Sequence, residues 1–370
     1  MAAWRHILCS NDGVEIDEIR GSQERSAGLA LNGVSSGGLR VSLRDPLAGR
    51  LMDDDVIMKS YRAGTVPPLL CGPVLTAEEV TGGVLGPTVA VTYADPFIDL
   101  IGDEGRLCGK LLDAEGRGAG LKLGTPLAPM DRTTMISQLL DAANAEGNTR
   151  IRMGNTAPSS ASHAGPWYFK PVGEAIAEIS SALDGPDFRV RAVEPFTDVS
   201  GLVLGLLDVT PAFGQVRPDV IFAYETGERN CSGYQRARRK QTTNRVFHLP
   251  PGFPDAPTGP VVTALDQAAI NARGLHEAVV PGDIGALNLR QRLCDEHVRV
   301  RKTPRTITTF TVKVDAGPQF GSEWGLGDLV TAQATFEGVP RMDETLRVYG
   351  VDFAPGDDGR ETVQPRLVPA

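Results

Sequence analysis

The chain lacks most of the features by which metal proteins, disulfide-stapled proteins and membrane proteins are recognised from sequence. Its five cysteines are an odd number at wide spacings, and none stands in a Cys-x-x-Cys pair, so neither a zinc site nor a disulfide framework is supported. We therefore expect free thiols in a reducing cytoplasm. No run approaches the ~18 consecutive apolar residues of a membrane-spanning helix. Aromatic residues are scarce, at 6%, so the cores should consist of Val, Leu, Ile and Ala.

Positive charge is also in deficit. The chain carries 37 Lys and Arg against 46 Asp and Glu, a net charge of −9. This balance argues against general affinity for nucleic acid or for an anionic membrane, although a local basic patch could still bind. The amino-terminal stretch has no long apolar core and turns acidic at once, so it is not expected to be a signal peptide.

Glycine and proline, by contrast, are plentiful. The 42 Gly and 27 Pro favour many turns and a chain rich in strands. Residues 4–100 contain short β-prone runs separated by turn residues. In one of them Leu39, Val41 and Leu43 alternate with polar residues, as in a half-buried strand. Several such strands at short spacing suggest a small barrel or sandwich.

The hydrophobic period then changes to that of helices. Residues 131–147 predict a helix capped by Asp131 and ended by Gly147, and residues 170–185 predict a second. The polar, Ser-rich segment 148–165 between them predicts a surface loop, and the Gly-rich segment 101–128 predicts a hairpin or extended loop.

Strands return from Phe188, residues 264–298 predict one or two helices, and the tail from 306 to 367 is β again. Strand blocks that cluster rather than alternate singly with helices favour a multidomain α+β chain over a parallel α/β sheet. We expect four segments: 1–125 as an N-terminal β-barrel, 126–187 as a helical or mixed domain, 188–300 as a β-rich segment followed by helices, and 301–370 as a C-terminal β-barrel.

Motifs that would carry catalysis are weak. Ser35 lies in a Gly-x-Ser-x-Gly sequence, but a strand follows it where a nucleophile elbow needs a helix. The Gly-rich run 116–124 lacks the Lys-Ser/Thr pair of a phosphate-binding loop. The acids Asp53, Asp54 and Asp55 do not have the alternating spacing of a calcium loop and predict a solvated turn. We therefore expect no catalytic, cofactor-binding or metal-binding residues.

The histidines support the same conclusion. None stands four residues from another, and none lies in a His-Glu-x-x-His sequence, so no metal pair or catalytic triad can be proposed from spacing. They are His6, His163, His248, His276 and His297.

One basic segment stands out. Residues 229–245 hold six basic residues and no acid, with Tyr234 among them. A tyrosine in a basic run could stack on a nucleic acid base. Docking against an acidic protein and a plain exposed loop are the other interpretations.

The two ends of the chain also echo one another. The segments 52–67 and 325–340 each place an aspartate before alternating apolar residues, then an aromatic, a glycine, a valine and a proline. Asp55 and Asp328 each stand twelve residues before that proline. The echo could mark two related elements, or it could be the chance similarity of two hairpins.

A wider resemblance joins these segments. The first runs from an alternating strand through the turn Asp45-Pro46-Leu47 and an acidic turn to Tyr61-Arg62 and then Gly72-Pro73-Val74. The middle segment 217–246 and the tail 304–367 follow in the same order. In this order the sequence resembles the minor tail proteins that form the baseplate or tail-tip hub of long-tailed bacteriophages, over almost its whole length.

The resemblance implies a trimeric ring at the tail tip, with two small related β-barrels per subunit joined by helical and mixed segments. Six barrels around a channel would match a six-fold tail tube to three-fold tip proteins. The implied partners are two further copies, a tail-tube or distal tail protein, the tape measure protein and tip or fibre proteins. DNA would only pass through, no cofactor is implied, and the chain would be made in the bacterial cytoplasm and end in the virion.

The sequence departs from the family pattern in one respect. Many hub proteins continue into a peptidase, lysozyme or receptor-binding extension, whereas this sequence ends at Ala370. We therefore expect such activities on another polypeptide. The rival functions are a nucleic-acid-binding module that uses 229–245 and a cryptic hydrolase that uses Ser35 or the acids 53–55.

Overall fold

The computed structural model divides the chain into two compact units. One comprises residues 1–235 with 309–370, and the other residues 236–308. The chain is mostly β with a smaller helical part, in agreement with the predicted α+β class. The structure describes residues 4–369 apart from 54, 63–66, 82–85, 103–104, 109–129, 163–169, 183, 228, 240–241, 251–256, 258, 281–286, 314 and 356–360.

The N-terminal strands fold as the alternation of their residues predicts. They lie in one continuous sheet in the order β2-β1-β5-β6-β7-β4-β3. The short helix α1 (Ala48–Asp53) follows the Asp45 turn, and its Leu51 packs into the core that these strands enclose. The strands are β1 (Arg5–Ser10), β2 (Glu15–Glu18), β3 (Gln23–Ala30), β4 (Ser36–Ser42), β5 (Val56–Tyr61), β6 (Leu70–Val80) and β7 (Thr88–Ala94).

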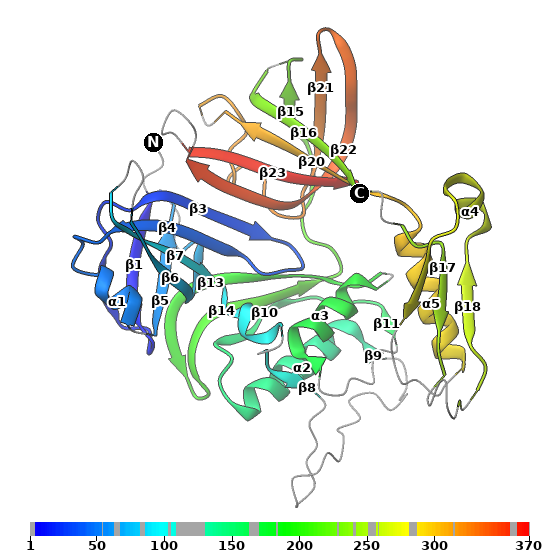
Figure 1. The fold of residues 1–370 in the computed structure, drawn as a ribbon, viewed down its shortest axis with the longest axis horizontal. Helices are drawn as coiled ribbons and strands as arrows, with labels where there is room; N and C mark the ends of the chain where they lie inside the picture. The colour runs from blue at the N-terminus through cyan, green and yellow to red at the C-terminus, as the bar shows by residue number, and fades with distance from the viewer. Residues whose placement is uncertain are drawn as a thin grey trace, which may run out of the picture. The chain divides into compact units, whose positions relative to one another are not determined.

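The C-terminal strands form the other end of the same sheet, in the order β15-β21-β22-β23-β20-β16. Their core holds Phe222, which stacks on Phe310 and meets Trp324 edge to face, and Phe353, which meets Phe320 edge to face. The strands are β15 (Val216–Tyr224), β16 (Cys231–Arg239), β20 (Arg305–Val312), β21 (Leu329–Phe336), β22 (Val339–Pro355) and β23 (Glu361–Pro369). Figure 1 shows β3 and β4 of the N-terminal group in blue, β15 and β16 of the C-terminal group in green, and β20 to β23 in orange to red.

The two strand groups share one order of neighbours. The N-terminal path is β1-β5-β6-β7-β4-β3, and the C-terminal path is β15-β21-β22-β23-β20-β16. Numbered by their order in the sequence within each group, the six strands follow one another in the same spatial order in both paths. The echoing segments occupy equivalent places, because Asp55 directly precedes β5 and Asp328 directly precedes β21. One difference is that β1 runs antiparallel to β5 whereas β15 runs parallel to β21. The groups meet where β22 pairs with β3.

A layer of helices and a small sheet separates the two strand groups in sequence. Helix α2 (Arg132–Glu146) begins at Asp131, which accepts from the Thr134 N–H at 2.9 Å, and ends at Gly147, as predicted. Helix α3 (Val172–Ser181) confirms the second prediction. The small sheet runs β10 (Ile151–Thr156), β14 (Gly201–Thr210), β13 (Asp187–Asp198). The helices and the small sheet share one core. The 3₁₀ helix η1 (Pro96–Leu100) also contributes to it. Short two-residue strands complete the layer: β8 (Leu107–Cys108), β9 (Met130–Asp131), β11 (Ala161–Ser162) and β12 (Lys170–Pro171).

The predicted surface loop 148–165 was wrong in its first part. Strand β10 lies there and pairs in parallel with β14. Its sequence shows little alternation of apolar and polar residues, and of its side chains only Ile151 is fully buried. The Asn144 side chain of α2 donates to the Ile151 carbonyl oxygen at 3.0 Å. The strand is therefore specified by its neighbours rather than by its own period. The predicted Gly-rich hairpin 101–128 lies largely outside the described residues.

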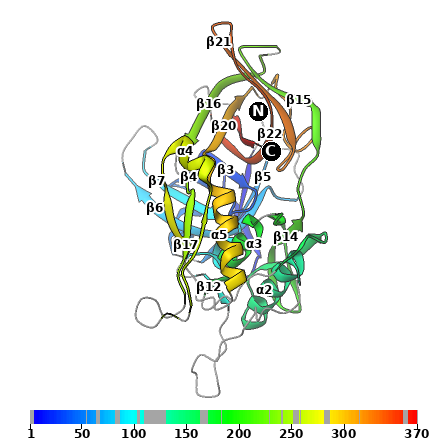
Figure 2. The ribbon, with the colours of Figure 1, turned by 90° about the vertical axis from the view of Figure 1, so that its right-hand side faces the viewer.

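The second unit has a three-stranded sheet, in the order β18 (Val262–Leu265), β17 (Arg245–His248), β19 (Glu277–Val280). Helix α5 (Leu287–Arg301) packs along β17 and β18 (Figure 2) and buries Cys294 and Val298. Helix α4 (Gln267–Arg273) ends at Gly274. The helices predicted within 264–298 are thus confirmed as α4 and α5, but Glu277–Val280 is a strand, since its β-branched pair lies beside β17.

A buried ion pair fastens three distant segments of the first unit. Asp187, at the start of β13, is 6% exposed and is paired with Arg347 of β22. The same carboxylate accepts from the Asn32 side chain at 2.9 Å, at the β3–β4 turn, and from the Phe213 N–H at 3.0 Å. A second pair joins Arg62 to Glu361 at 2.7 Å. These contacts hold the N-terminal strands, the middle layer and the C-terminal strands together.

None of the helices in the described part of the chain is long and apolar enough to cross a membrane.

We predict that Asp187→Ala lowers the free energy of unfolding by about 2–4 kcal/mol, because Arg347 and the Phe213 N–H would lose their buried acceptor. Urea unfolding followed by tryptophan fluorescence measures the change. Asp219→Ala is the matched control, since Asp219 is exposed on β15 and should change stability by less than ~0.5 kcal/mol. Equal effects of the two substitutions would contradict the role given to Asp187.

Candidate functional site

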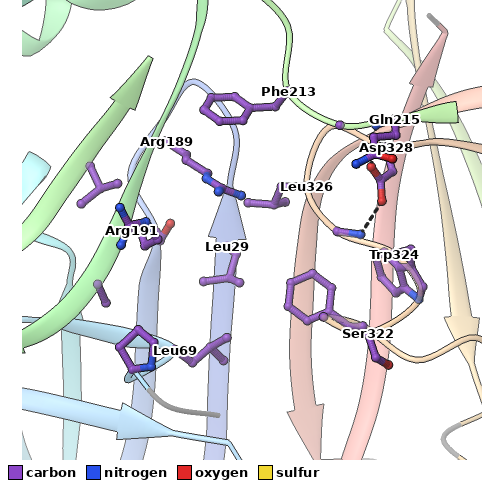
Figure 3. Close-up of a pocket in the computed structure, with 18 of the residues that line it drawn as sticks. Leu29, Leu69, Arg189, Arg191, Phe213, Gln215, Ser322, Trp324, Leu326 and Asp328 are labelled. Atoms are coloured by element: carbon purple, nitrogen blue, oxygen red, sulfur yellow. Dashed lines mark hydrogen bonds between the residues drawn. The ribbon is translucent and has the colours of Figure 1, made fainter. Parts of the chain in front are cut away.

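One cavity of the first unit lies where its three parts meet. It has a volume of about 650 Å³ and is lined by residues from β3, β13, the loop before β15 and the loop before β21. We call it the arginine pocket, after the side chains that give it its charge. It is defined by Arg189, Arg191, Phe213, Arg217, Trp324 and Asp328 (Figure 3).

One wall of the arginine pocket is basic. Arg189 and Arg191 stand two residues apart on β13, so both side chains project from the same face of the strand. Both reach the fully buried Asp208 of β14, Arg191 at 3.0 Å and Arg189 at 3.4 Å. The Arg189 guanidinium also lies 4.7 Å from the centre of the Phe213 ring. The buried carboxylate and the ring fix the arginines in place, because ion pairing and cation–π contact favour one orientation.

The opposite wall is organised by Asp328. Its carboxylate accepts from the Gln215 N–H at 2.7 Å and from the Gly325 N–H at 2.9 Å, and Arg217 lies at 3.4 Å. This aspartate therefore ties the loop before β15 to the loop before β21. Figure 3 shows Asp328 and Gln215 side by side on this wall, with Trp324 beneath them.

Two glycines allow these loops to approach. Gly214 and Gly327 both have positive φ, 86° and 89°. A Cβ on Gly214 would lie 2.1 Å from the Gly327 carbonyl carbon, and a Cβ on Gly327 would lie 2.6 Å from Phe213. Only residues without a Cβ fit this backbone contact. The wall is thus built for close packing of two loops more than 100 residues apart in sequence.

The arginine pocket suits a group that is both acidic and apolar. Arg189, Arg191 and Arg217 each use one edge of the guanidinium on an aspartate, and each guanidinium has five N–H donors. Donors therefore remain directed at the cavity, beside the rings of Phe213 and Trp324. A carboxylate next to an aromatic or aliphatic side chain would satisfy both kinds of surface.

Ser35 does line this cavity, but in a structural role. Its Oγ accepts from the Ala30 N–H at 3.3 Å, and its own N–H donates to Asp95 at 2.7 Å. Asp95 also accepts from the Phe97 N–H and so caps η1. Burial raises the pKa of Asp95 to about 7. A strand, β4, follows Ser35, so the predicted hairpin turn is confirmed and the strand-to-helix elbow of a hydrolase is not formed.

Of the three acids of the other hydrolase hypothesis, the described Asp55 does not line the arginine pocket. Asp53 ends α1, Asp55 is exposed before β5, and Asp54 lies outside the described residues. Among the residues that the structure describes, no three His, Cys, Asp or Glu side chains are grouped so that they could hold a metal ion. The five cysteines are buried as separate thiols.

The described histidines stand apart from one another. His248 and His297 lie in the second unit, where burial lowers the pKa of each. His276 donates its N–H to Asn244, and His163 lies outside the described residues. His6 is 1% exposed, stacks on Trp4 and shares a hydrogen bond of 2.8 Å with Ser60.

The basic segment 229–245 is divided by the fold. Tyr234 packs against Tyr224 and Phe310 at the edge of the C-terminal core, so its ring is already stacked within the protein. Arg236 and Arg238 are exposed on β16, and Arg245 belongs to the second unit, where it pairs with Glu277 at 3.4 Å. The combination of a free aromatic ring with a basic run, on which the nucleic-acid hypothesis depended, is therefore not present.

Sequence reasoning missed the arginines of the pocket. Arg189 and Arg191 alternate with apolar residues along a predicted strand, which shows that they share a face but not what that face meets. Their partner Asp208 and the aromatic Trp324 are distant in sequence. The alternation was the one available signal in the sequence. The fold adds that the shared face of the two arginines meets Asp208 and lines the pocket.

The comparisons with known proteins bear on the fold. No protein-family model and no curated protein matches the sequence. Among solved structures, the 43 kDa tail protein of prophage MuSo2 from Shewanella oneidensis matches with a TM-score of 0.55 and 13% identity, over 99% of this chain and 98% of that one. A tail protein from Neisseria meningitidis MC58 matches with a TM-score of 0.51 and 13% identity, over 99% and 96%.

A third match is the prophage tail protein gp18 from Listeria monocytogenes EGD-e, with a TM-score of 0.50 and 8% identity, over 98% of this chain and 94% of that one. The chain has the fold of these tail proteins. The resemblance found in the sequence is thus confirmed at the level of fold and over nearly the whole chain. At 8–13% identity the shared feature is the arrangement of strands and helices, not a set of side chains.

We predict that His6 makes stability fall as the pH drops from about 6.5 towards 4. Burial, with a smaller effect of Arg25, lowers the pKa of His6 in the folded protein to about 4, whereas the unfolded chain binds the proton near 6.5. The contribution of neutral His6 to the free energy of unfolding is nearly complete at pH 7, and about 2 kcal/mol of that free energy is lost between pH 7 and 5. Urea unfolding at both pH values measures it.

The control for this prediction is His6→Phe, which keeps an aromatic ring beside Trp4 but cannot titrate. Its loss of stability between pH 7 and 5 should be smaller than that of the native chain by about 2 kcal/mol, since other titrating groups such as Asp95 cancel in the difference. Equal losses in the two proteins would show that His6 is protonated as readily in the folded state as in the unfolded state.

Proposed function

We propose that this chain is a structural component of the tail of a phage or phage-derived particle, and that it stands at the tail tip as a hub. The observation that carries the proposal is the near full-length match of fold to tail proteins of three prophage or bacterial origins. A fold by itself does not fix a function. The proposal is also compatible with the arginine pocket, whose described lining residues do not form a converging set of catalytic side chains.

The shape of the proposed assembly follows from the two strand groups. We interpret them as two small related β-barrels, because their strands have the same order of neighbours and because the echoing segments occupy equivalent places in both. Three copies would then place six barrels around one axis. Such a ring can bind a six-fold tail tube on one side and three-fold tip proteins on the other.

The partners of this ring would be a tail-tube or distal tail protein, the tape measure protein and the tip or fibre proteins. Repeated contacts of one kind between copies close naturally into a ring when the rotation permits. Each contact would need well over ~1,000 Å² of buried surface to be stable. The work of the protein would be interface formation, channel closure and passage of DNA, and it would take place in the virion.

The channel of the ring should be acidic or neutral. An electropositive lining would hold DNA by its phosphates rather than let it slide. The net charge of −9 is compatible with such a lining. The arginine pocket should accordingly lie away from the bore.

We predict that the purified chain has a native mass of three chains of 39.4 kDa and forms a three-fold ring in averaged electron images. Analytical ultracentrifugation measures the mass, with tail-tube protein added where the chain alone is too dilute to assemble. A monomer without a ring, alone and with tail-tube protein, would contradict the proposal. A monomer would favour the enzyme and nucleic-acid-binding hypotheses instead.

A further inference from the structure

The β21–β22 hairpin ends in an exposed tip with one acid between two apolar side chains. The turn is Glu337-Gly338, with φ of 48° and 78°, which is the left-handed pair that a two-residue hairpin turn of type I′ requires. Phe336 and Val339 face each other across the strands and are 50% and 51% exposed. Apolar side chains at a protruding tip indicate a surface that another molecule covers.

The tip cannot fill the arginine pocket of its own chain. Asp328, in the wall of that pocket, is followed by the eight residues of β21 before the tip is reached. At about 3.3 Å per residue the strand carries the tip roughly 25 Å from the wall. Figures 1 and 2 show the end of this hairpin pointing away from the middle layer that contains β13 and β14. A contact between tip and pocket must therefore join two copies.

The chemistry of the tip matches that of the pocket. The carboxylate of Glu337 is exposed and has no hydrogen bond or ion pair within the described part of the chain. The pocket offers guanidinium donors from Arg189 and Arg191 beside the rings of Phe213 and Trp324. A carboxylate flanked by an aromatic and a branched aliphatic side chain is the kind of group that such a cavity holds.

A second hairpin, between β13 and β14, also ends in an exposed apolar residue, Val199. Its acid is less available, because Asp198 is already paired with Arg152 at 2.7 Å and accepts from the Ser200 N–H at 2.8 Å. Moving this carboxylate into another pocket would break both contacts. The β21–β22 tip requires no such exchange.

We propose that the tip Phe336–Val339 of one copy sits in the arginine pocket of a second copy, with the Glu337 carboxylate on the guanidinium groups of Arg189 and Arg191. This inference rests on the proposed ring and names the contact that closes it. Tip and pocket are different surfaces of the same chain. A copy whose tip is bound to one neighbour therefore still has its pocket for the tip of the next. Contacts of this head-to-tail kind generate closed rings.

Disulfide trapping tests the contact. The variants Val339→Cys and Ser322→Cys place a thiol on the tip and an exposed thiol in the pocket and keep the Glu337 carboxylate, while the native cysteines are buried. Mixed and oxidised, the two variants should form a covalent dimer, and a chain carrying both should form species up to a covalent trimer. The pair Val199→Cys and Ser322→Cys is the matched control and should remain uncrosslinked.

A charge reversal provides the second readout. Glu337→Lys should weaken self-association at least tenfold in sedimentation equilibrium and leave the unfolding midpoint of the subunit unchanged, because the exposed Glu337 side chain has no hydrogen bond or ion pair within the part of the chain that the structure describes. Glu79→Lys makes the same change at an exposed site on β6 and should have no effect.

The outcomes separate this inference from the function on which it rests. A trimeric ring with neither the Val339–Ser322 crosslink nor an effect of Glu337→Lys would overturn the tip contact and leave the proposed hub intact. Crosslinking of Val199 instead of Val339 would assign the pocket to the other hairpin and overturn the inference as well. A chain that remains monomeric with tail-tube protein present would overturn the ring and the contact together.

Discussion

The pairing of Asp187 with Arg347 is the constraint on which the rest of the first unit depends. It joins the start of β13 to β22, and through Asn32 it also fastens the β3–β4 turn. Arg347 donates further to the carbonyl oxygens of Phe213, at 3.1 Å, and of Gly327, at 3.3 Å. This partly buried pair, whose partners would be costly to separate, therefore joins the two strand groups and the layer between them, together with the Arg62–Glu361 pair and the pairing of β22 with β3.

The arginine pocket is a consequence of that junction. Its walls come from segments far apart in the chain. The loops that hold Gly214 and Gly327 are in backbone contact, and hydrogen bonds of Asp328 and Arg347 bridge them. A cavity made in this way exists only in the folded subunit. The same junction sets the position of β21 and hence the direction in which its tip projects. Stability and the capacity for assembly thus depend on the same contacts.

The sequence predicted those parts of the fold whose signal is local. Helix α2 was found because Asp131 and Gly147 mark its ends, and the C-terminal strands were found because their residues alternate. Strand β10 was missed because a parallel strand under a helix is specified by its neighbours. The pocket could not be predicted, since Arg189 becomes informative only beside Asp208 and Phe213. The echo of Asp55 and Asp328 was visible, but only the shared order of strands gave it structural meaning.

The most direct test of the central claim is an electron cryomicroscopy reconstruction of the tail tip of the particle that contains this chain. The account predicts three copies in a closed ring on the tail axis, with the two strand groups of each copy alternating around the channel next to the tail tube. A chain found elsewhere in the particle, or present in a number of copies other than three, would contradict it.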